Sequence, residues 1–216
     1  MLGFYNYTVI LTYLSLCSGI TGIWFCTMVD RWGNRHPGIA VICLLISGLC
    51  DAFDGRIARM RKESTDQEKR FGIQIDSLCD LICFGVLPCC IGYAVGMTHP
   101  LYVPVFCAFV LAALIRLAYF NVSEEDRQKQ TTEKRKSYQG LPVTSSSLIF
   151  PFFFLAMFTG ARPYMQYIWL GVLLIPALLF VFESLKIRKP SFKGILFLIF
   201  IGAVELAILL VLKALT

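Results

Sequence analysis

Four aspartates lie at the ends of two consecutive apolar segments, at positions 51, 54, 76 and 80. Asp51 and Asp54 are three residues apart, and Asp76 and Asp80 are four apart, so each pair shares one face of a helix. A charged aspartate at the centre of a membrane span costs about 2.5 to 3.5 kcal/mol, so aspartates in such segments usually have a function. Residues 60–71 connect the two segments as a hairpin, and we therefore expect the two acidic faces to meet.

Four carboxylates this close together repel one another unless protons or divalent cations neutralise them. Ligands that are all carboxylate oxygens favour magnesium or manganese over zinc. Metal ions held in this way bind a diphosphate and stabilise the negative charge that builds on a leaving phosphate group. The four aspartates thus predict a Mg²⁺ or Mn²⁺ site that acts on a diphosphate.

Small residues accompany the aspartates. Gly55 follows Asp54 directly, Gly72 lies one helical turn before Asp76, and Ala58 keeps the same face small. Glycine allows a ligand or another helix to approach the backbone closely. Arg59 lies one turn after Gly55, where its guanidinium could pair with a phosphate.

Residues 51–59 and 72–80 resemble the signature of the CDP-alcohol phosphotransferase family, D-x-x-D-G-x-x-A-R, a spacer, then G-x-x-x-D-x-x-x-D. Every fixed position of that signature is filled. The resemblance implies that a pair of Mg²⁺ or Mn²⁺ ions binds the diphosphate and that Asp80 is the general base as well as a metal ligand. The implied metal ligands are Asp51, Asp54, Asp76 and Asp80, and the implied CDP-binding residues are Asp51, Gly55, Ala58, Arg59 and Gly72.

Three further stretches, residues 76–88, 116–122 and 138–143, resemble the branch of this family that uses CDP-diacylglycerol and L-serine and releases CMP. In the implied reaction, Asp80 takes the proton of the serine hydroxyl as that hydroxyl attacks the lipid-side phosphorus. Serine also carries a carboxylate, which needs a cationic partner. Arg116 is the candidate because it is a cation inside an apolar segment, and Asn121 lies five residues further on. The loop cations Lys134, Arg135 and Lys136 are alternatives.

The elements that must position these residues are membrane-spanning helices. Hydrophobic residues make up 57% of the 216 residues and charged residues 16%, compared with about 25% charged residues in soluble domains. Apolar runs long enough to span a membrane occur at 7–28, 38–57, 73–95, 101–121, 143–160, 164–184 and 194–214. We therefore expect an all-α polytopic membrane helix bundle of about seven transmembrane helices, forming a single catalytic domain over residues 1–216. The resemblance implies a six-helix core and a homodimer.

The first run lacks the features of a cleavable signal peptide. The acidic start of the polar segment at Ser123 resembles a helix start and predicts a short cytoplasmic helix. Fourteen of the 20 lysines and arginines lie in the loops at 59–71, 122–141 and 185–193. The positive-inside rule places these loops, and with them the aspartates, at the cytoplasmic face. We expect a bacterial or archaeal cell membrane rather than the endoplasmic reticulum.

Anionic membrane lipids account for the net charge of +6, so we expect no nucleic-acid partner. Two alternatives remain open. The enzyme could use another acceptor, such as inositol phosphate or glycerol phosphate, or an archaeal lipid donor. The protein could instead be a cation-coupled transporter, although transporters usually bind their ions near the membrane midplane. Glu205, within the last run, either faces a dimer contact or is protonated, and has no assigned role.

Overall fold

The computed structural model describes residues 9–31, 33–60, 65–130, 137–188 and 192–215. The helices are α1 (Ile10–Thr27), α2 (Pro37–Met60), α3 (Asp66–Asp80), α4 (Leu87–Ala94), α5 (Val103–Gln130), α6 (Ser146–Phe154), α7 (Met165–Val181) and α8 (Phe192–Leu215). A π-helical segment, Leu81–Val86, joins α3 to α4 in one continuous rod. Short 3₁₀ turns occupy Pro100–Tyr102, Val143–Ser145, Leu155–Phe158 and Arg162–Tyr164.

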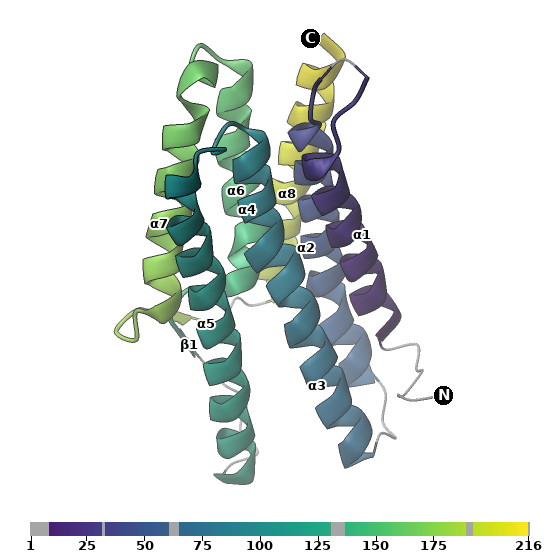
Figure 1. Ribbon diagram of the computed structural model, residues 1–216. Coiled ribbons are helices and arrows are strands. Elements are labelled where there is room, and N and C mark those ends of the chain that lie inside the picture. Colours follow the sequence, from purple (N-terminus) through teal and green to yellow (C-terminus); the bar gives the residue numbers. More distant parts are fainter. Residues whose placement is uncertain (1–8, 32, 61–64, 131–136, 189–191, 216) are drawn as a thin grey trace.

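The helices run roughly parallel and antiparallel to one another in a single bundle, and α3 and α5 reach furthest toward its lower end in Figure 1. Within the described residues, six helical segments are long and apolar enough to cross a membrane: 10–27, 37–54, 66–94, 100–127, 162–181 and 194–212. The fifth predicted run corresponds to a shorter apolar helix, Val143–Phe158, with Pro151 inside it. The prediction of an all-α membrane bundle is confirmed.

The polar segment after residue 121 continues α5 without a break, so the prediction of a short helix beginning at Ser123 was wrong. Glu124 and Arg127, one turn apart, form an ion pair at 2.6 Å that supports the extension. Two short antiparallel strands, which the sequence did not predict, are β1 (Ser137–Gln139) and β2 (Lys186–Arg188). These strands join the segment before α6 to the segment before α8.

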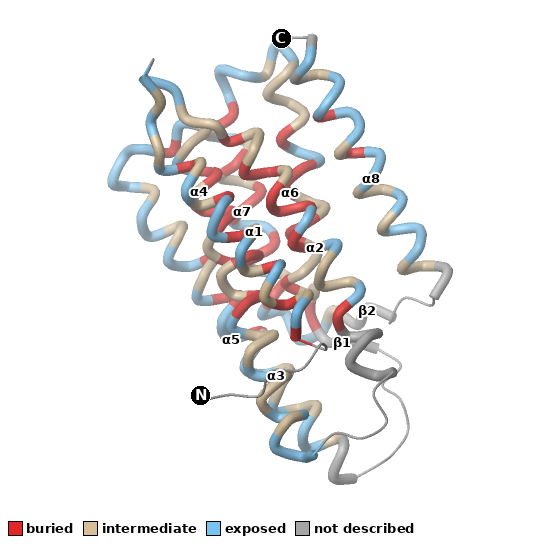
Figure 2. The backbone as a smooth tube through the Cα atoms, turned by 90° about the vertical axis from the view of Figure 1, so that its right-hand side faces the viewer, coloured by how far each residue is buried: buried red, intermediate tan, exposed pale blue. Residues whose placement is uncertain are grey.

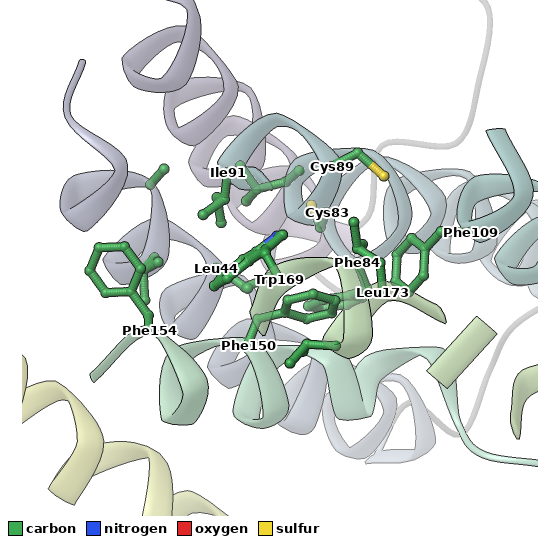
Figure 3. Close-up of a cluster of buried hydrophobic side chains, with 14 of the residues drawn as sticks. Leu44, Cys83, Phe84, Cys89, Ile91, Phe109, Phe150, Phe154, Trp169 and Leu173 are labelled. Atoms are coloured by element: carbon green, nitrogen blue, oxygen red, sulfur yellow. The ribbon is translucent and has the colours of Figure 1, made fainter. Parts of the chain in front are cut away.

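Aromatic side chains fill the centre of the bundle, where α4, α5, α6 and α7 meet (Figure 3). Phe150 packs edge-to-face against Phe109 and lies 5.2 Å, centroid to centroid, from Trp169. The Trp169 indole N–H donates to the Pro88 carbonyl at 3.0 Å, so the buried polar atom of this large residue is satisfied. This apolar core holds the second half of the α3–α4 rod in place.

Helix α1 packs closely on α2 and on the α3–α4 rod through small residues. A Cβ atom added at Gly19 would lie 2.6 Å from the Cys83 sulfur, and the Ser18 hydroxyl donates to the Cys43 carbonyl at 2.9 Å. Small residues and hydrogen bonds across the interface are what hold helices together in a membrane, because lipid provides no hydrophobic drive for their association. The position of α1 relative to the acidic helices is therefore well defined.

Helix α8 stands at the edge of the bundle, and most of its residues are exposed or intermediate (Figure 2). It contacts α2 and α6, where Leu148 lies 3.3 Å from a Cβ added at Gly202. Glu205 is 5% exposed, and its Oε2 has no hydrogen-bond partner among the described residues. The carboxyl group thus points into the protomer rather than toward an outside surface.

Candidate active site

Three carboxyl groups converge between α2 and α3. Ligand oxygens of Asp51, Asp76 and Asp80 all lie within 4.8 Å of one another. Asp51 lies near the end of α2, whereas Asp76 and Asp80 occupy the last turns of α3. The prediction that the two acidic faces meet is confirmed.

Local sequence signals fix where α3 begins and how it continues past the acids. Thr65 and Glu68 form a reciprocal capping box, with hydrogen bonds of 2.9 and 3.2 Å, that starts the helix at Asp66. The π-helical segment begins directly after Asp80. Pro88 lacks an amide hydrogen, which gives a local reason for the chain to leave the regular α-helical pattern just before it. Wide turns of this kind occur frequently at functional sites.

The fourth aspartate, Asp54, is 7% exposed and points toward α1. Its Oδ2 accepts a hydrogen bond of 3.3 Å from the Thr12 hydroxyl. It still interacts electrostatically with Asp76 and Asp80, so the four carboxylates form one cluster. Asp54 is nevertheless absent from the compact group of three.

The small residues of the signature lie next to this cluster along the chain. Gly72 lies one turn before Asp76 on α3, and a Cβ added there would meet nothing within 4 Å. The backbone at this turn is therefore open to a ligand. Gly55, Ala58 and Arg59 belong to the last turns of α2, and their side chains lie outside the described part of the structure.

Asn121 of α5 contacts α3, the helix that carries Asp76 and Asp80. Its side-chain Nδ2 donates to the Ser77 hydroxyl at 2.8 Å, which connects α5 to α3 next to Asp76. The side-chain NH₂ group of Asn121 is therefore engaged with Ser77. Asn121 therefore contacts the helix that carries Asp76 and Asp80, and its role in acceptor binding stays a prediction.

Arg116 is buried, with 6% of its surface exposed. Its Nε donates to the Leu141 carbonyl at 3.3 Å, and its guanidinium lies 5.5 Å from the centre of the Phe120 ring. Gly140 packs against it and has a φ of +72°, a conformation that favours glycine. Arg116 thus connects α5 to the turn before α6. The alternative cations at 134–136 lie outside the described residues.

Two hydrogen-bonding residues at the site were not predicted from the sequence: Thr12, which contacts Asp54, and Ser77, which lies on α3 and accepts the bond from Asn121. The available signals were weak, because Thr12 is one of several hydroxyl residues in the first apolar run and Ser77 reads as a spacer within the signature. A hydroxyl on the buried face of a membrane helix is the feature that could have identified Thr12.

The donor set fits a hard divalent cation. Carboxylate oxygens suit Mg²⁺ and Mn²⁺, and oxygens that share one Mg²⁺ at about 2.1 Å lie at most about 4.2 Å apart. The oxygens of Asp51, Asp76 and Asp80 lie within 4.8 Å. Shifts of less than about 1 Å would therefore bring them onto a single ion.

The fold and the site define a class: a polytopic membrane helix bundle with a partly buried cluster of carboxylates between two neighbouring helices. The family description "CDP-alcohol phosphatidyltransferase" matches residues 5–182. The chain belongs to this family. The match includes all four aspartates and ends before α8.

Several relatives carry the same description, "CDP-diacylglycerol--serine O-phosphatidyltransferase". The Saccharomyces cerevisiae protein is 36% identical over 139 residues, covering 62% of this chain and 49% of its own length. The Mycobacterium leprae protein is 30% identical over 139 residues (64% and 43%), and the Helicobacter pylori strain 26695 protein is 32% identical over 121 residues (55% and 47%). The matches thus span about half or less of each relative. No solved structure gives a significant match.

Proposed function

We propose that this membrane protein is a phosphatidylserine synthase, which transfers the phosphatidyl group of CDP-diacylglycerol to the hydroxyl of L-serine and releases CMP. The observation that carries the proposal is the convergence of Asp51, Asp76 and Asp80 between α2 and α3. Family membership makes a cation-coupled transporter the weaker explanation of this cluster. The choice of serine is supported by the names of the relatives.

The proposal includes a divalent-metal requirement. Asp51, Asp54, Asp76 and Asp80 would hold a pair of Mg²⁺ or Mn²⁺ ions, and the open backbone at Gly72 would leave room for the CDP part of the donor. Bound metal would neutralise the diphosphate and stabilise the departing CMP. Gly55, Ala58 and Arg59 complete the proposed CDP-binding set.

Asp80 is the proposed general base. It is 8% exposed and lies at the junction of α3 and the π-helical segment. The serine oxygen forms a bond to the lipid-side phosphorus while the bond from that phosphorus to CMP breaks. The hydroxyl proton passes to the Asp80 carboxylate and then to solvent, so the products are phosphatidylserine, CMP and one proton.

The proposed acceptor side is formed by Arg116 and Asn121. Arg116 supplies a buried cation for the serine carboxylate, held in place by its hydrogen bond to Leu141. Asn121 is tied through Ser77 to α3, the helix that carries Asp76 and Asp80. With the basic loops inside, the site lies at the cytoplasmic face. We propose a homodimer in a bacterial or archaeal cell membrane.

The test is an assay of the detergent-solubilised protein with CDP-diacylglycerol, Mg²⁺ or Mn²⁺, and separate acceptors: L-serine, inositol phosphate and glycerol phosphate. We expect CMP release with L-serine and a phosphatidylserine product identified by mass spectrometry. Faster release with a phosphorylated acceptor, or with an archaeal CDP-lipid donor, would overturn the assignment within the family. Arg116→Gln should raise KM for serine and leave KM for the donor unchanged.

A further inference from the structure

We infer that Thr12, on α1, is a positioning residue for the metal site and acts by orienting Asp54. This inference rests on the proposed function, because it concerns how the chain holds the ions that the reaction would use. The Thr12 hydroxyl donates to Asp54 Oδ2 at 3.3 Å, and both side chains are buried, with 5% and 7% of their surface exposed.

Asp54 differs from the other three acids in its surroundings. The ligand oxygens of Asp51, Asp76 and Asp80 lie within 4.8 Å of one another, whereas the Asp54 carboxyl lies between α1 and Asp76, because it accepts a hydrogen bond from Thr12 and interacts with the Asp76 carboxyl. The rotamer of this carboxylate therefore depends in part on α1, a helix that carries none of the acids. Hydrogen bonds to ligating carboxylates orient them, and losing such a partner typically reduces metal affinity 10- to 100-fold.

The anchoring of α1 makes this hydrogen bond a fixed feature of the site. The Thr12 carbonyl accepts a hydrogen bond of 3.2 Å from the Cys79 thiol, which neighbours Asp80. One turn along α1, Ser15 and Ser47 of α2 exchange hydrogen bonds of 3.3 and 3.0 Å, and the Cys83 thiol donates to the Ser15 carbonyl at 3.3 Å. These bonds hold α1 against both helices that carry the acids. The Thr12 hydroxyl therefore keeps a fixed position relative to Asp54.

Direct metal binding tests the inference without the lipid substrates. Mn²⁺ is titrated into the purified full-length protein and followed by electron paramagnetic resonance. We expect Thr12→Val to weaken Mn²⁺ binding about 10- to 100-fold and Thr12→Ser, which keeps the hydroxyl, to stay within about threefold of the wild type. Thr21→Val is the matched control, because the Thr21 hydroxyl is exposed and bonds to the Cys17 carbonyl of its own helix at 2.7 Å.

The activity readout should separate positioning from a structural defect. A positioning role predicts that Thr12→Val needs more Mg²⁺ for half-maximal CMP release while kcat recovers at saturating metal. If Thr12→Val elutes as an aggregate in size-exclusion chromatography, Thr12→Ala replaces it, because alanine removes atoms without adding any. Unchanged Mn²⁺ binding in either variant would overturn the inference. A wild-type protein that binds no Mn²⁺ would instead overturn the metal site of the proposed function.

Discussion

The hydrogen bond between Asn121 and Ser77 offers a sharp prediction about the acceptor side of the site. Replacing Asn121 with alanine removes the 2.8 Å bond that ties α5 to α3 beside Asp76. A neutral hydrogen bond of this kind contributes about 0.5 to 1.5 kcal/mol, which corresponds to about a 2- to 12-fold loss. We expect a loss of this size in kcat/KM for serine.

A double-mutant cycle shows whether Asn121 acts through Ser77 or on serine directly. If Asn121 acts through Ser77, then Ser77→Ala has a similar effect and the double variant loses no more than the worse single variant. The assay is CMP release at varied serine concentration and saturating donor. Thr27→Ala is the control and should change the rate less than about twofold, because its exposed hydroxyl bonds only within its own helix.

The outcome that refutes this reasoning is additivity. If the two single effects add, and Asn121→Ala still raises KM for serine in the Ser77→Ala background, then Asn121 contacts the acceptor without help from Ser77. That result would leave the proposed acceptor residues intact. It would show that Asn121 does not influence the reaction through Ser77 and α3.

Three further predictions concern the acids, the metal and the turn at Arg116. Asp80→Asn should lower CMP release with serine about 10²- to 10⁴-fold, the usual contribution of a general base, and near-normal release from a monodisperse variant would contradict that role. Chelation with EDTA should abolish activity, added Mg²⁺ or Mn²⁺ should restore it, and bound metal should raise Tm; activity that survives complete chelation would contradict a metal requirement. Gly140→Ala should lower Tm by several degrees, because the glycine has φ +72° and its added Cβ would lie 2.7 Å from the Phe180 carbonyl. Gly171→Ala, where nothing lies within 4 Å, should leave Tm nearly unchanged, and equal shifts would refute the steric argument.

The meeting of the acidic faces could be predicted from the sequence because it depends on local spacing. Asp51 and Asp54, and likewise Asp76 and Asp80, share a helix face whatever the rest of the chain does. Apolar runs of membrane-spanning length predict helices, because lipid offers no partner for an unpaired backbone. The fifth predicted run, which contains Pro151, formed a shorter helix.

Only the tertiary structure decided which residues outside the signature contact the acids or the helix that carries them. Thr12 lies 42 positions from Asp54, and Asn121 lies 44 positions from Ser77. No local pattern encodes such pairs, because they depend on how α1 and α5 rotate against α2 and α3. That rotation is set by small residues such as Gly19 and by the aromatic core. The sequence by itself therefore determined the acids and their helices, while packing between helices determined how those acids are held.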